Sequence, residues 1–228
     1  MGAQSSTEIA NLALSKLGAK RIQDIGDDSS KGAREANLQY GPALRAMLRR
    51  HRWNFALKRA QLTELADSPA FGYNNQFQLP TDFIRLAQVN QEEVWETSKA
   101  DWFEVEGGDT GRVILINAAE CYIRYVWENT NTQQFDDLFV QAFALQLAAL
   151  CARKVTGSDS KEHAIQQELE EFMLPMTQQV NAAEAHSGSN PPIIEALAGS
   201  HLVRSRGQVS SEDLPLGPDE TVYTDYPA

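Results

Sequence analysis

The sequence lacks the features by which secreted, membrane-spanning and metal-binding proteins are usually recognised. Its 228 residues include only two cysteines, and these lie among apolar residues without CxxC or Cys/His spacing. The start of the chain has no basic segment followed by an apolar run, and no unbroken run of about 18 apolar residues occurs. We therefore expect synthesis in the cytoplasm, no membrane partner, and reduced core residues at Cys121 and Cys151.

Residue types that perform catalysis are present, but they do not converge. Acidic doublets at 92–93, 136–137 and 170–171 could supply paired carboxylates, yet adjacent residues on a helix point in different directions, and residues 136–137 suit a helix N-terminus. The glycine-rich residues 107–111 lack nucleotide-binding spacing and predict a hairpin turn. We expect no cofactor, no metal and no enzymatic activity; a small hydrolase built from scattered acids is the weaker alternative. Four histidines share no metal-ligand spacing: His51, His163, His186 and His201.

Charge is distributed unevenly in a chain whose net charge is -11. Residues 1–65 contain eleven bases and six acids, whereas residues 66–187 contain seven bases and nineteen acids. Residues 188–228 contain two bases and six acids. This asymmetry indicates that different segments face different neighbours.

The positive charge is concentrated in residues 45–59, which hold six Lys or Arg and no acid. In an acidic chain such a run favours contact with a polyanion or an acidic partner, and the candidate contact residues are Arg45, Arg49, Arg50 and Arg52. The alternative is ion pairing with the acidic middle of the same chain. No helix-turn-helix or zinc-finger pattern supports sequence-specific DNA binding. Trp53 and Phe55 within the run are expected to be core anchors rather than surfaces for base stacking.

Helical periodicity predicts two helices before residue 53. The first begins with the capping-box pattern Ser5-x-x-Glu8 and ends at Gly18. The second begins after residues 27–30, and Pro42 predicts a kink or a restart near residues 40–41. Its apolar stripe consists of Ala33, Ala36, Tyr40, Leu44, Met47 and Leu48.

The periodicity then changes to that of strands until about residue 128. Trp53, Phe55 and Leu57 alternate with Asn54, Ala56 and Lys58, which predicts a strand with one buried face. The turn at residues 80–82 and the hairpin turn at 107–111 separate further strands. Together they predict one small antiparallel sheet, with strands at 77–79, 84–89, 102–106, 113–116 and 122–127.

Two more helices are predicted after the strands. Residues 133–156 carry one broad apolar stripe that includes Phe139, Phe143 and Leu150, and Gly157 ends this helix. The next helix begins at Ser158 or Ser160, and Pro175 predicts a kink in it. Its expected buried line is Ile165, Leu169, Phe172, Met173, Met176 and Val180.

These elements predict an α+β protein: a four-helix bundle with an antiparallel β-rich insertion between the second and third helices, plus an extended C-terminal arm. The expected boundaries are 1–52 and 130–187 for the bundle, 53–129 for the β-rich domain and 188–228 for the arm. Gly, Ser and Pro dominate the arm, so it cannot bury enough surface to order alone, and we expect a partner to bind it. Its candidate binding residues are Pro191, Pro192, Ile193, Ile194, Leu197, Leu202 and Val203.

Three stretches of the chain resemble the tail tubular protein A family, the head-to-tail adaptors of short-tailed bacteriophages. They are EIANLALSKLGAKRIQDI (residues 8–25), LRRHRWNFALKRAQL (48–62) and FQLPTDFIRL (77–86), and they occur in the family's order. The likeness spans roughly residues 5–185, and the Trp-Asn-Phe-Ala run after a basic helix end is its most specific part. Residues 188–228 are longer than the family's usual ending.

The resemblance implies a non-enzymatic virion protein, made in the cytoplasm of a bacterial host and located at the head–tail interface. It implies a dodecameric ring that contacts the portal protein and the tail nozzle protein, with the helical part toward the portal. The ring would continue the channel for genome retention and ejection, with double-stranded DNA in the lumen bound without sequence specificity. The alternative from the residues alone is a freestanding DNA-binding or regulatory protein that uses the basic helix end at 45–59.

Overall fold

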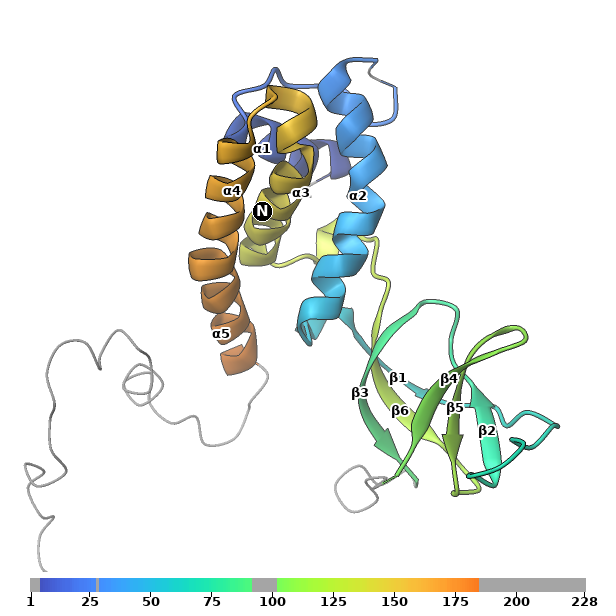
Figure 1. The fold of residues 1–228 in the computed structure, drawn as a ribbon. Helices are drawn as coiled ribbons and strands as arrows, with labels where there is room; N and C mark the ends of the chain where they lie inside the picture. Colours follow the sequence, from blue (N-terminus) through green and yellow to red (C-terminus); the bar gives the residue numbers. More distant parts are fainter. Residues whose placement is uncertain (1–4, 28, 92–101, 185–228) are drawn as a thin grey trace, which may run out of the picture. The chain divides into compact units, whose positions relative to one another are not determined.

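The chain combines helices and antiparallel strands in an α+β fold (Figure 1). The computed structural model describes residues 5–27, 29–91 and 102–184. In chain order the elements are α1 (Ser6–Lys16), α2 (Lys31–Arg50), η1 (Asn54–Ala56), β1 (Leu57–Gln61), β2 (Asn75–Gln78), β3 (Phe83–Asn90), β4 (Glu104–Gly108), β5 (Gly111–Ile116), β6 (Tyr122–Trp127), η2 (Thr132–Gln134), α3 (Asp137–Thr156), α4 (Asp159–Glu168), η3 (Leu169–Met173) and α5 (Leu174–Glu184).

Capping groups set where the helices begin and end. The predicted capping box of α1 is confirmed: Ser5 N donates to Glu8 Oε2 at 2.7 Å, and Glu8 N donates to Ser5 Oγ at 3.1 Å. Asp136 caps α3 by accepting from two backbone amides of its first turn, as expected for an acid at a helix start. Gly157 ends α3 with φ of +71°, a conformation that glycine adopts at little cost.

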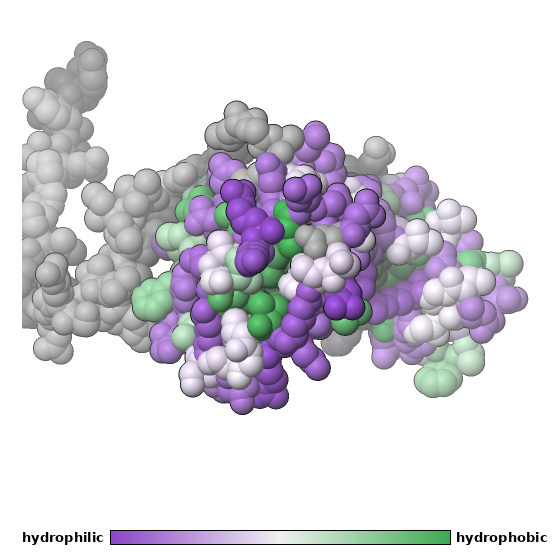
Figure 2. All heavy atoms as spheres, turned by 90° about the horizontal axis from the view of Figure 1, so that it is seen from above, coloured by the Kyte–Doolittle hydropathy of each residue, from purple (hydrophilic) through white to green (hydrophobic). Residues whose placement is uncertain are grey.

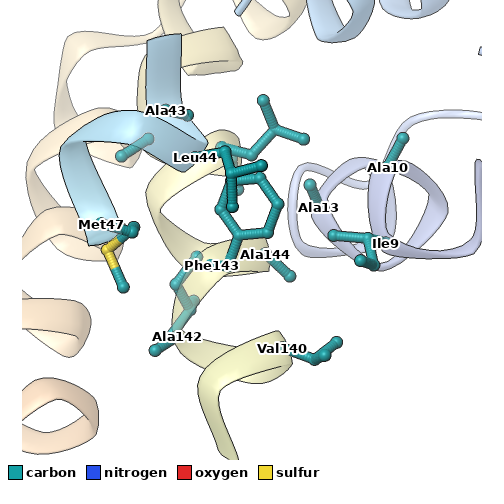
Figure 3. Packing of buried hydrophobic residues seen from close by; sticks show 14 of the residues in the cluster. Ile9, Ala10, Ala13, Ala43, Leu44, Met47, Val140, Ala142, Phe143 and Ala144 are labelled. Carbon is teal, nitrogen blue, oxygen red and sulfur yellow. The ribbon is translucent and has the colours of Figure 1, made fainter. Parts of the chain in front are cut away.

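Helix α3 is the central helix, and it packs against α1, α2 and α4. Figure 3 shows the Phe143 ring of α3 beside Leu44 of α2, with Ile9 and Ala13 of α1 nearby. Among the described residues, α3 is the one helix long and apolar enough to cross a membrane by length and composition, but most of it is buried inside the protein. Leu150, expected in its buried stripe, is instead exposed.

The surface above this core is mainly polar. Figure 2 views the molecule from above, and hydrophilic residues dominate that face, with hydrophobic residues visible only in places between them. Both cysteines are buried free thiols, and burial raises the pKa of each to about 12. The prediction that Cys121 and Cys151 are reduced core residues is therefore confirmed.

Helix α2 does not restart at Pro42. It runs without interruption from Lys31 to Arg50 with Pro42 inside it, so the predicted restart near residues 40–41 is wrong. Pro42 itself is exposed, whereas Ala43, Leu44, Met47 and Leu48 are buried. Burial of the apolar stripe on both sides of the proline holds the helix together despite the missing N–H group.

The described strands form two antiparallel sheets of three strands each, ordered β1-β6-β3 and β2-β5-β4. The strands expected at 77–79, 84–89, 113–116 and 122–127 and the hairpin turn are confirmed, but the single sheet is wrong. Pro80 has no N–H group with which to continue the ladder of β2, so the chain crosses to the other sheet after it. A shared apolar cluster lies between the sheets: Leu62, Phe77, Leu79, Val89, Ile114, Ile116, Cys121, Ile123 and Tyr125.

The strand expected from Trp53 to Leu57 is only partly present. Residues Asn54–Ala56 form a 3₁₀ turn, and strand β1 begins at Leu57. Asn54 N donates to Asn181 Oδ1, and Asn54 Nδ2 donates to Asn181 O, both at 2.9 Å. These two bonds to α5 pull the backbone into a turn, so the strand alternation of Trp53 and Phe55 has a different cause: both rings enter the helical core.

The last helical run contains a π turn, η3, between α4 and α5. The expected buried line is correct for Ile165 and Leu169 but wrong beyond them, because Phe172, Met176 and Val180 are exposed. The wider π turn adds one residue, so the side chains that face inward are displaced by one position. Leu174 and Thr177 are buried instead. The turn lies immediately before Pro175, where a helical hydrogen bond is missing, so the predicted disturbance takes this form.

Candidate functional site

The end of α2 is anchored by a buried tryptophan. Trp53 is 1% exposed, and its Nε1 donates to Met47 O in the last turns of α2 at 2.9 Å. Its ring packs edge-to-face on Phe139 and His51 with centroids 5.0 Å apart, and it stacks on Phe55 at 6.3 Å. Trp53 and Phe55 are therefore core anchors, as expected, and they fix the position of the basic residues around them.

Two reciprocal hydrogen bonds join the last turn of α2 to strand β3. Arg49 Nη1 donates to Ile84 O at 2.8 Å, and Arg85 Nη1 donates to Arg49 O at 2.9 Å. The second bond satisfies a backbone carbonyl at the helix C-terminus, where a cation also suits the helix dipole. The pair places Arg85 beside the basic end of α2.

Four arginines, from the end of α2 and from β1, β3 and β6, gather beside one another: Arg52, Arg59, Arg85 and Arg124, called the arginine cluster here. Arg59 and Arg124 lie directly opposite each other in the β1–β6 register. Burial lowers the pKa of Arg85, with further contributions from Arg52 and Arg49. Burial likewise lowers the pKa of Arg124, followed by Arg59 and Arg52. Arg52 is therefore close enough to repel both half-buried guanidinium groups.

The arginine cluster is a concentration of positive charge without a matching acid. Among the described residues, no ion pair joins Arg52, Arg85 or Arg124 to an acid. Arginine stays protonated even when its pKa is lowered, so the repulsion persists at neutral pH. Like charges opposite each other in a sheet destabilise it. An anion bound between these guanidinium groups would remove that cost.

His51 lies beside the arginine cluster and is held neutral by it. Burial lowers its pKa, and the positive charges of Arg85 and Arg52 lower it further. A neutral imidazole against Trp53 adds packing rather than charge at pH 7. The cluster's charge therefore comes from arginine alone.

Only one of the four arginines predicted as contacts belongs to this cluster. Arg45 pairs with Glu128 at 3.0 Å and Arg50 pairs with Glu170, so the alternative of ion pairing with the acidic middle segment holds for both. Arg49 bonds to the carbonyl of Ile84. Arg52 is the member that faces other arginines. Whether any of the four contacts a partner stays a prediction.

A groove of about 300 Å³ lies where the outer side of α2 meets the strands. Arg45 and Arg49 line it together with Arg112, whose guanidinium carbon lies 5.9 Å from the centroid of the Phe83 ring. Glu128 lines it too, so the groove carries more positive than negative charge. It extends the basic surface of this region beyond the arginine cluster.

Sequence reasoning missed Arg85 and Arg124. Each stands alone among apolar neighbours in its own strand, so no local run of charge marks it. The signal lies in the pairing: Arg124 faces Arg59 across β1 and β6, and Gln88 faces Arg124 across β3 and β6. Such a pairing can be recognised only once the register of three strands separated in sequence is known.

The other predicted features are placed as follows. Glu170 pairs with Arg50 and Glu171 accepts from Gln167, so this doublet forms separate surface contacts rather than one site. Among residues 5–27, 29–91 and 102–184, no group of three or more His, Cys, Asp or Glu is arranged to hold a metal ion. The doublet at 92–93 and all the arm residues from Pro191 to Val203 lie outside the described residues.

Comparisons with models of known protein families and with curated proteins give no match to this chain.

Proposed function

We propose that this chain is a structural virion protein, a head-to-tail adaptor of the tail tubular protein A type. Its subunits would form a dodecameric ring between the portal and the tail nozzle and continue the DNA channel. The proposal includes the finer architecture expected from the sequence, a four-helix bundle with a β-rich insertion and an extended C-terminal arm. The observation that carries it is the arginine cluster, which concentrates positive charge on fixed elements of an acidic chain.

A ring gives such a cluster its effect. One exposed charge contact contributes only about 0–1 kcal/mol, but in a ring the same contact is repeated in every subunit. Guanidinium groups bind phosphate oxygens without reading bases, which suits a channel through which a whole genome passes. The anchoring of Arg85 to Arg49 and the register of Arg59 with Arg124 hold the charges in place before any anion binds.

The test of this function is assembly on the portal. Because acidic subunits repel one another, we expect the isolated protein to be mainly monomeric and to form a ring only with the cognate portal. Mass photometry of the protein with and without portal should give a complex whose added mass corresponds to about twelve subunits. A stable dodecamer without portal would contradict the role of the template, and no complex with portal would contradict the adaptor function.

Truncation after Ser187 tests the C-terminal arm. The truncated protein should keep the thermal unfolding midpoint of the full chain, because the described core ends before this point. Its affinity for the portal should fall, since prolines at 191 and 192 reduce the entropy lost when the arm docks. Surface plasmon resonance on immobilised portal measures this, and unchanged affinity would remove the arm from portal binding.

The alternative function, a freestanding DNA-binding or regulatory protein, is favoured by the same arginine cluster. It differs in the expected state of the protein, because it requires the monomer or a small oligomer to bind DNA without any portal. Electrophoretic mobility shift with the isolated protein at physiological salt distinguishes the two. Tight binding of the monomer to DNA, with no binding to portal, would favour the alternative.

A further inference from the structure

The last helical run exposes an apolar stripe to solvent. Phe172 is 69% exposed, Met176 45% and Val180 39%, and their spacing of four residues places them on one side of η3 and α5. The π turn has this effect because it turns the residues that would continue the buried line outward. Large apolar side chains gathered on one exposed helix side are typical of an interaction surface.

Acidic residues surround this stripe. Residues 162–184 contain five glutamates and no Lys or Arg. Glu162, Glu168 and Glu170 pair with bases of other helices, whereas Glu171 accepts only from Gln167 within the helix. A partner for this acidic and apolar face therefore needs basic groups around an apolar side chain.

The outer side of α2 has that composition. Residues 31–50 contain five Lys or Arg and one acid, Glu35, whose carboxylate accepts from Gln39. Arg34, Leu38 and Arg45 are exposed and lie four and seven residues apart, which places them on one side of the helix. Leu38 is 67% exposed, so an apolar residue stands between two basic ones.

These two faces lie on different sides of the subunit. Helix α3 packs against both α2 and α4, and Figure 1 shows it between them. One face therefore cannot cover the other within the same chain. Two different and complementary faces of one molecule give head-to-tail contacts, which close into a ring when the rotation between copies allows it.

We propose that the outer side of α2, with Arg34, Leu38 and Arg45, binds the stripe of Phe172, Met176 and Val180 on a second copy of this chain. Leu38 packs between Phe172 and Met176, and the arginines face the glutamates beside the stripe. This interface rests on the proposed function, for which it supplies the contact between neighbouring subunits. Its partner is this chain itself, identified by complementary charge and by matching exposed apolar residues.

Cysteine cross-linking tests the interface, because both native cysteines are buried and do not compete for the reagent. Leu38→Cys and Met176→Cys are made as separate single variants and assembled on the portal with a short bismaleimide. Neither variant alone should give cross-linked dimers, whereas their equimolar mixture should. The double variant should give a ladder of products up to the full ring. Phe71→Cys, also exposed but in the strand region, is the matched control and should not cross-link with Met176→Cys.

Charge reversal gives a second readout. Arg34→Glu should lower the fraction of portal carrying a complete ring by at least tenfold, and Glu171→Arg in the same chain should restore it in part. Complete rings without the mixed cross-link overturn the interface and leave the adaptor function standing, whereas no assembly by the unmodified protein overturns both. Dimers from a single variant would show a symmetric contact instead. Loss of the mixed cross-link on truncation after Ser187 would assign the stripe to the C-terminal segment.

Discussion

Replacing Trp53 with alanine is expected to lower the free energy of unfolding by about 3–5 kcal/mol, the usual cost of removing a buried aromatic ring. Trp53 is almost completely buried, and its ring contacts His51, Phe55 and Phe139. The variant also leaves Met47 O without the indole N–H that it accepts from. Urea denaturation followed by far-UV circular dichroism gives the change in midpoint.

Two further variants make this result specific. Trp102→Ala removes a tryptophan that is 79% exposed, so the free energy of unfolding should change by no more than about 0.5 kcal/mol. Trp53→Phe keeps most of the ring but removes the hydrogen bond, and it should fall between the other two. Equal stability of Trp53→Ala and Trp102→Ala would show that the end of α2 is not anchored as described.

Loss of two members of the arginine cluster should weaken binding of the assembled ring to double-stranded DNA. Arg52→Gln combined with Arg124→Gln removes two charges that no acid neutralises among the described residues. Charged hydrogen bonds contribute about 1.5–3 kcal/mol when buried and less at the surface, so we expect affinity to fall roughly tenfold to a hundredfold. The slope of log K against log salt should also decrease by about 2, because each lost phosphate contact removes about 0.9.

The control for this experiment has the same change in net charge. Arg45→Gln combined with Arg50→Gln removes two arginines that already pair with Glu128 and Glu170. Binding of this variant to DNA, measured by fluorescence anisotropy across a salt series, should stay within a few-fold of the unmodified ring. An equal loss in both double variants would mean that net charge, rather than the arginine cluster, determines binding.

The parts of the fold that the sequence predicts well are those determined by neighbouring residues. The capping box at Ser5 and Glu8, the cap at Asp136 and the strand Tyr122–Trp127 depend on contacts a few residues away. Their positions in the sequence therefore carry enough information. The same holds for the basic run at 45–59, which marks the correct region of the molecule.

The parts that were wrong depend on distant partners. The turn at Asn54 forms because Asn181, 127 residues further on, bonds to it. The arginine cluster needs the register of β1, β3 and β6, and the ion pair of Arg50 needs Glu170 on the far side of the sequence. A single sequence contains no local signal for any of these contacts, because each arises only when separate elements pack.

The π turn links the inner and outer surfaces of the last helix. Because it adds one residue, Thr177 faces the core and Asn181 reaches Asn54, while Met176 and Val180 face outward. A deletion of one residue within Leu169–Met173 would restore a regular α-helix and rotate everything after it by about 100°. Small insertions and deletions at this point would therefore exchange the outward-facing side chains for the inward-facing ones in a single evolutionary step.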